Sequence, residues 1–147
     1  RENYMGNKNS HASAVRRMMD HIDGKNVFQF GIRSATGEEM KYAKEHTNMF
    51  YFNVYEPLKK VLQQIGSRPV YVTVDIDVAD PAYAPATGTP EAGGITSQEL
   101  IKSILLLKDV NLAGFDIVEV APYNNEAEHT SFLAAKIIRE VLLMAGS

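Results

Sequence analysis

The chain has 147 residues, of which 45% are hydrophobic and 22% are charged, with a formal net charge of −3 and no cysteine. This composition is ordinary for a globular protein and excludes a disordered chain or a disulfide-rich scaffold. The acidic balance argues against nucleic-acid binding, and no apolar run approaches the roughly 18 residues of a membrane span. The absence of cysteine is compatible with a reducing cytosol, so we expect a cytoplasmic protein.

The first half of the chain alternates between predicted helices and strands. Residues 1–10 are polar and predict a loop, and Ser10 is a suitable N-cap for a helix over residues 11–22. Strands are predicted over 27–34 and 49–54. Helices are predicted over 36–46 and 55–65, the second with apolar residues at the helical period.

The next predicted strand, over residues 70–76, is β-branched and apolar enough to be buried on both faces, and Asp75 and Asp77 lie at its carboxyl end, with Asp80 shortly after. Alternate residues of a strand face the same side, so Asp75 and Asp77 are expected at one site, at the carboxyl end where open parallel sheets bind ligands. Two close carboxylates favour a bound cation, and their hard oxygens suit Mg²⁺, Ca²⁺ or Mn²⁺. The alternative is a turn in which Asp77 and Asp80 cap the backbone.

A segment over residues 81–97 contains three prolines and three glycines, which predicts an ordered, functional loop. A helix over 97–107 and a strand over 111–120 follow. Asp116 and Glu119 on this strand are an odd number of residues apart, so at most one is expected in the site unless a bulge intervenes. Glu119 lies at the carboxyl end, either in the site or as a surface acid, and Asp116 is expected in a buried ion pair or a hydrogen bond to a ligand.

The last predicted helix covers residues 126–147 and is expected to have a solvated first turn with His129 and Thr130, the alternative being that these two residues line the entrance of the site. The alternation of strands and helices predicts an α/β fold with a mostly parallel sheet covered on both faces.

Several fixed positions around the 70–76 strand resemble the ureohydrolase family, the dimanganese enzymes that include arginase and agmatinase. They are Thr73-Val-Asp75-Ile-Asp77, Pro81, Pro85-Ala86 and Gly94. Gly31-Ile-Arg33 and the segment from Gly6 to Ser13 also recur in that family.

The resemblance implies a three-layer α/β/α arginase-like fold, of which residues 1–147 are the C-terminal half of a single ureohydrolase domain. The family's other metal ligands lie in Gly-Gly-x-His and Asp-Ala-His-x-Asp segments, and neither is present in this sequence. We therefore expect the chain alone to lack the full metal cluster and to be inactive without the missing half.

The resemblance also implies roles for individual residues. Asp75 and Asp77 would hold the two Mn²⁺ ions of the cluster, and Glu119 would bind a guanidinium through charge-assisted hydrogen bonds. His11 would lie beside the bound guanidinium as a substrate-binding residue and donate a proton to the leaving amine, although a lone histidine in a first helical turn is otherwise a surface or capping residue. Arg33 could contact a carboxylate at the site, form a structural salt bridge or touch another subunit.

The segment Ser10-His11-Ala-Ser followed by Arg16-Arg17 is most similar to agmatinases. This implies hydrolysis of agmatine to putrescine and urea, a step of polyamine biosynthesis. An arginase, a guanidinobutyrase and a noncatalytic binding relative are the alternatives. The family resemblance further implies a homo-oligomer, trimeric or hexameric.

Overall fold

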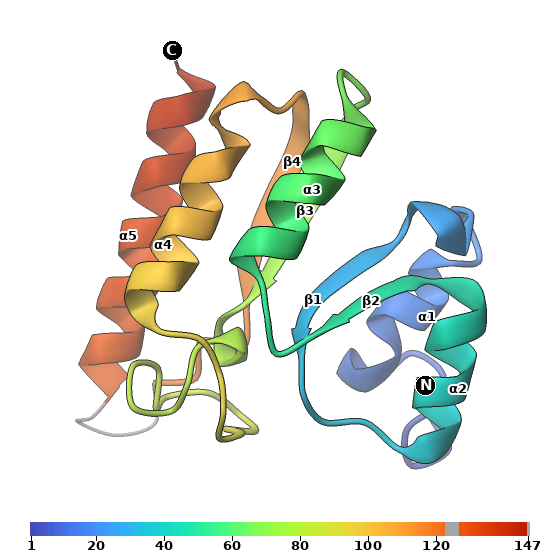
Figure 1. The fold of residues 1–147 in the computed structure, drawn as a ribbon. Coiled ribbons are helices and arrows are strands. Elements are labelled where there is room, and N and C mark those ends of the chain that lie inside the picture. The colour runs from blue at the N-terminus through green and yellow to red at the C-terminus, as the bar shows by residue number, and fades with distance from the viewer. Residues whose placement is uncertain (123–126, 147) are drawn as a thin grey trace.

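The computed structural model describes residues 1–122 and 127–146, in which strands alternate with helices (Figure 1). The strands are β1 (Phe28–Ile32), β2 (Asn48–Tyr51), β3 (Val70–Asp75) and β4 (Leu112–Val118). The helices are α1 (Ala14–Met18), α2 (Gly37–His46), α3 (Tyr55–Ile65), α4 (Ser97–Leu105) and α5 (Ala127–Ala145). The predicted α/β alternation is therefore confirmed. Residues 126 and 147 of the last predicted helix lie outside the described ranges.

The first predicted helix is much shorter than expected. A 3-10 turn, His11–Ser13, precedes α1, and the Ser10 hydroxyl accepts the Ala12 N–H at 3.2 Å, which confirms the N-cap. The helix ends at Met18 because the mostly polar residues 20–23 offer no apolar face. Instead, the Asp23 side chain caps a second 3-10 turn, Gly24–Asn26.

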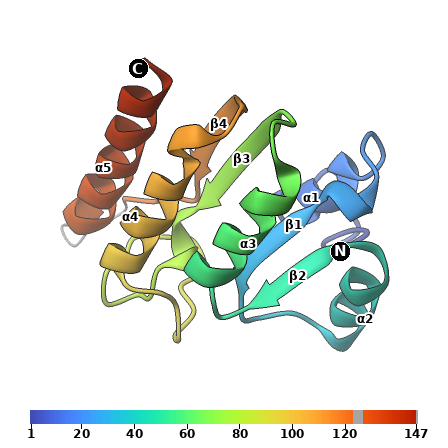
Figure 2. The ribbon, with the colours of Figure 1, turned by 45° about the horizontal axis from the view of Figure 1, so that its top comes forward.

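The strands form two parallel pairs, β1 with β2 and β3 with β4. Across the molecule they follow the order β4, β3, β1, β2, and no ladder of hydrogen bonds joins β3 to β1 within the described ranges (Figure 2). The end of β1 nevertheless approaches the turn after β3. A Cβ atom on Gly31, which has a φ of +71°, would lie 2.6 Å from the Val78 side chain.

Helices α3, α4 and α5 cover one face of the β3–β4 pair (Figure 1). Val74 points into the resulting core, whereas Tyr71 is 58% exposed and Thr73 and Asp75 are also exposed. The prediction that this strand is buried on both faces is therefore wrong for residues 1–147: the described part of the chain supplies a helical layer for one face only. Parallel sheets are almost always covered on both faces, so this pair offers a surface for a further layer.

The core lies between β3, β4 and the three covering helices. It is built from buried aliphatic side chains, whose burial drives the association of these elements: Val54, Val74, Ile76, Ala79, Ala84, Ile95, Leu100, Ile104, Leu107, Leu133, Ala134, Ile137 and Val141. None of the helices in the described part of the chain has both the length and the apolar character that crossing a membrane requires.

Candidate functional site

The carboxylates predicted at the tip of β3 lie where the strand becomes a turn. Asp75 is the last residue of β3, and its Oδ1 accepts the N–H of Asp77 at 3.1 Å, which caps the 3-10 turn Ile76–Val78. Asp77 is thus in the turn and not on the strand, so the argument from strand alternation is wrong for this pair. The capping alternative is confirmed in part, because the cap of this turn is Asp75 and not Asp77.

Three acidic side chains influence one another at this tip. Partial burial, followed by repulsion from Asp77 and Glu119, raises the pKa of Asp75 to about 7, although its surface is still reached by solvent. Partial burial also raises the pKa of Asp77, and Glu119 adds to that rise while the Arg33 guanidinium opposes it. The structure therefore brings Asp75, Asp77 and Glu119 together from two neighbouring strands.

Glu119 follows β4 directly and has a φ of +63°, in the left-handed region that non-glycine residues rarely adopt. Such a conformation costs on the order of 1–3 kcal/mol and is concentrated at functional sites. Its Oε2 lies 3.3 Å from the position that a Cβ atom on Gly88 would occupy. The glycine therefore allows the loop backbone to approach this carboxylate closely.

Asp116 is placed differently from Glu119, as the odd spacing predicts. Its two carboxylate oxygens accept hydrogen bonds from the Tyr71 hydroxyl at 2.6 Å and the Thr73 hydroxyl at 2.5 Å. The ring of Tyr71 lies so close to Gly114 that a Cβ atom there would be 2.7 Å from it. The expected buried ion pair is thus wrong, because the donors are neutral hydroxyls on the exposed face of β3.

The Pro/Gly loop is fixed at both sides. The Asp80 carboxylate accepts the N–H groups of Ala82, Gly93 and Gly94 at 3.0, 2.9 and 3.2 Å, which confirms its predicted role in a turn. These bonds, led by the one from Ala82, lower the pKa of Asp80. The loop is therefore ordered, as its composition predicts.

Two further residues hold this loop, and neither was predicted to do so from the sequence. The Arg33 guanidinium donates to the carbonyl oxygens of Asp77 and Glu91. Thr130, expected in a solvated helical turn, is fully buried, and its hydroxyl accepts the Ala86 N–H at 2.9 Å. The position of Arg33 near the end of a predicted strand was a usable signal, whereas no such signal in the sequence marked Thr130.

His11 is exposed, and its ring packs edge-on against Tyr4 with a centroid distance of 5.6 Å. Among the described residues, no hydrogen bond or ion pair joins His11 to Asp75, Asp77 or Glu119. The structure thus gathers three of the four predicted site residues and leaves His11 on a separate segment.

Within residues 1–122 and 127–146, no group of three or more His, Asp or Glu side chains is arranged to hold a metal ion. Asp75 and Asp77 offer hard oxygen ligands, and partial burial together with neighbouring negative charge raises their pKa values, a cost to the ionised forms that a cation would offset. They fit one part of a divalent metal site. The remaining ligands would have to come from elsewhere.

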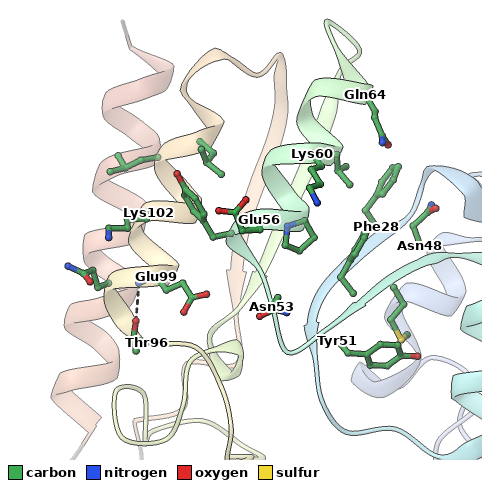
Figure 3. Close-up of a pocket in the computed structure, with 18 of the residues that line it drawn as sticks. Phe28, Asn48, Tyr51, Asn53, Glu56, Lys60, Gln64, Thr96, Glu99 and Lys102 are labelled. Atoms are coloured by element: carbon green, nitrogen blue, oxygen red, sulfur yellow. Dashed lines mark hydrogen bonds between the residues drawn. The ribbon is translucent and has the colours of Figure 1, made fainter.

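A cavity of about 1690 Å³ lies away from these carboxylates. It is bordered by β2, α3 and α4, and Figure 3 shows Glu56, Lys60, Glu99 and Lys102 around it. None of the acidic residues at the strand tips lines it. The candidate site is therefore the open edge at the ends of β3 and β4, and not this groove.

Comparison with known proteins places these features in a family. Residues 1–144 match the model of the arginase family. Agmatinases of Bacillus cereus and Bacillus subtilis are 51% and 50% identical over 146 residues, which is 97% of this chain and 50% of each relative. The chain thus spans about half the length of the curated relatives it matches.

Solved structures agree. A Clostridium difficile protein thought to be an agmatinase aligns with a TM-score of 0.93 and 37% identity, over 98% of this chain and 53% of that one. The proclavaminate amidino hydrolase of Streptomyces clavuligerus aligns with a TM-score of 0.87 and 34% identity, over 98% and 52%. These similarities confirm the predicted arginase-like α/β fold.

Proposed function

Since this chain belongs to the arginase family, we propose that residues 1–147 form the C-terminal half of a ureohydrolase domain that cleaves a guanidino compound to urea and an amine. The bare face of the β3–β4 pair supports this division, because a parallel sheet is normally covered on both sides. The missing layer would also carry the other metal ligands.

The convergence of Asp75, Asp77 and Glu119 is the observation that carries the proposal. Partial burial, with the nearby charge of Glu119, raises the pKa values of both aspartates, and Glu119 adopts a left-handed backbone conformation. A fold keeps such a conformation only where the surrounding structure enforces it. A site that binds cations explains why three acids are held together, since metal ions and a guanidinium are all positively charged.

Asp75 and Asp77 would hold manganese, and Glu119 would bind the guanidinium of the substrate. A carboxylate accepts two parallel N–H bonds from a guanidinium, which fixes the plane of the substrate as well as its position. Manganese, when bound, supplies Lewis-acid activation of water. Glu119 would therefore orient the guanidinium carbon toward the metal side of the site.

His11 would deliver a proton to the leaving amine. Its exposure and its position on a short N-terminal turn leave the ring accessible to solvent, from which a proton donor can be recharged. The edge of the Tyr4 ring restricts one side of the imidazole.

Agmatine is the proposed substrate, with putrescine and urea as products. The chain is about 50% identical to Bacillus agmatinases and 26% identical to the arginases of Bacillus caldovelox and Medicago truncatula. Arginase and guanidinobutyrase activities, and a noncatalytic relative, are the competing proposals. A cytoplasmic trimer or hexamer remains our prediction for the assembled enzyme.

Urea release from agmatine, arginine and guanidinobutyrate, measured with the complete protein and added Mn²⁺, tests the proposal. We expect agmatine to be preferred by at least about tenfold in kcat/KM, a difference of 1.4 kcal/mol in transition-state binding. Urea from none of the three would remove the enzyme proposal.

Asp77→Ala separates an enzyme from a binding module, because it removes one proposed metal ligand. We expect manganese content to fall and urea release to drop by about 1000-fold or more. Asp109→Ala is the matched control, since that carboxylate is 85% exposed and lies away from the strand tips. Unchanged manganese content in Asp77→Ala would contradict the proposed ligand role.

A further inference from the structure

Arg33 connects two parts of the fold that are distant in sequence. It directly follows β1, and its half-buried side chain reaches the turn and loop after β3. Its Nη2 donates to the carbonyl oxygen of Asp77 at 2.5 Å and to that of Glu91 at 2.7 Å, and its Nε donates to Glu91 at 3.2 Å. The partners are main-chain carbonyls, so this is none of the three contacts expected from the sequence.

The bond to Asp77 completes the anchoring of that residue. The Asp77 N–H is held by the Asp75 carboxylate at 3.1 Å, and the Asp77 carbonyl is held by Arg33. With both main-chain groups hydrogen-bonded, the backbone of Asp77 is restrained on either side of its Cα atom. The direction in which its carboxylate leaves the turn is therefore set by Arg33 and Asp75 together.

Gly31 places Arg33 within reach of this turn. It has a φ of +71°, and any Cβ atom there would lie 2.6 Å from Val78 and 3.1 Å from Val54. A side chain at this position would push β1 away from the turn that contains Asp77. The Gly31-Ile32-Arg33 segment thus combines a close approach with a long, planar donor.

We infer that Arg33 is a positioning residue, which fixes the main chain of Asp77 so that its carboxylate is preorganised to bind a divalent metal. This inference rests on the proposed function. Arginine suits the role because its rigid fork of donors can bind two carbonyls at once, whereas a lysine ammonium is a single flexible point. Loss of such an outer contact typically weakens metal binding by about 10- to 100-fold.

The test compares Arg33→Met, Arg33→Lys and Arg68→Met in the complete protein. Methionine keeps much of the apolar stem and removes every donor. Arg68 is a matched control, because its Nε also donates to a main-chain carbonyl, that of Ile65 at 3.2 Å, on an exposed helix end far from Asp77 in sequence. The measurements are Mn²⁺ affinity, from the EPR signal of free Mn²⁺ during titration, and the Tm of the protein without metal.

We expect Arg33→Met to weaken Mn²⁺ binding by about 10- to 100-fold, Arg33→Lys to weaken it less, and Arg68→Met to leave it unchanged. A purely structural role would lower the metal-free Tm of Arg33→Met without changing the Mn²⁺ affinity of the folded fraction. Mn²⁺ affinities within about twofold of the parent in the folded Arg33 variants, below the loss expected for an outer contact, would overturn the inference. If Arg33→Met does not fold, the Arg33→Lys affinity decides by the same criterion. A parent protein that neither binds Mn²⁺ nor releases urea would instead overturn the proposed function.

Discussion

The loop after β3 and the segment that carries His11 are both proposed to serve one reaction, yet the chain holds them very differently. The loop is anchored by Arg33, by the Asp80 carboxylate and by Thr130 from α5. The His11 segment has a serine cap and an edge-on aromatic contact.

The loop after β3 needs more anchoring than the His11 segment because of the residues that it carries. Partial burial and the charge of Glu119 disfavour the ionised forms of Asp75 and Asp77, so these carboxylates keep their positions only if the surrounding backbone holds them. A histidine that donates a proton does not have to be held against such an unfavourable interaction, and it needs access to solvent. Mutations in the loop should therefore reduce stability and metal binding together, whereas mutation of His11 should reduce catalysis alone.

Gly94→Ala should have the largest effect on stability. An added Cβ atom would lie 2.4 Å from the Asp80 nitrogen and 2.6 Å from the Ala79 carbonyl carbon, and backbone atoms cannot move aside as a flexible side chain can. We expect a loss of about 3 kcal/mol, the upper end for overpacking, measured by chemical denaturation. Gly37→Ala is the control, because nothing lies within 4 Å of its added Cβ atom. Equal stabilities of the two variants would mean that the loop is not tightly fixed.

His11→Gln should leave stability unchanged, since the side chain is exposed, and reduce kcat. Loss of a general acid typically costs at least about 100-fold, or about 2.7 kcal/mol in the activation barrier. His129→Gln is the control, because that histidine is also exposed but lies on α5. A normal kcat for His11→Gln in the complete protein, or an equal loss in His129→Gln, would contradict the assigned role.

The order of elements was predictable from the sequence because periodic apolar residues, turn residues and caps agree with one another along most of the chain. The strand over residues 70–76 was placed within one residue of β3. The sequence did not correctly predict how many faces of this strand are covered. Apolar residues indicate which faces a strand can bury, but they do not indicate whether the covering layer belongs to residues 1–147.

The acidic residues of the candidate site were predictable from their type and their place at strand ends, and their geometry was not. Asp75 and Asp77 were expected to alternate on a strand, but the Asp75 side chain ends the strand by capping the next turn. Arg33 shows the opposite case: its location was visible, but its partners are carbonyl oxygens, which have no signature in the sequence. Hydrogen bonds from side chain to backbone across 44 residues depend on tertiary structure alone.

Asp75 at the end of β3 and Asp80 in the loop that follows have opposite pKa shifts, so pH should distinguish their contributions. The folded-state pKa of Asp75 is raised from 3.8 to about 7, so its contribution to stability is complete below about pH 4 and is lost as the pH rises toward 7. Asp75→Asn is neutral at every pH and keeps an oxygen that can accept the Asp77 N–H. In the metal-free protein, we expect its stability relative to the parent to increase from about pH 4 to about pH 8.

Asp80→Asn is the control with the opposite sign. The pKa of Asp80 is lowered by the N–H groups that it accepts, so its stabilising effect is present above about pH 4 and is lost as the pH falls through the lowered pKa. This variant should be less stable than the parent at neutral pH, and the difference should shrink in acid. Urea unfolding curves across this range give both trends. Parallel pH profiles for the two variants would mean that burial and neighbouring charge do not raise the pKa of Asp75, and would remove the reason for a bound cation at the β3 tip.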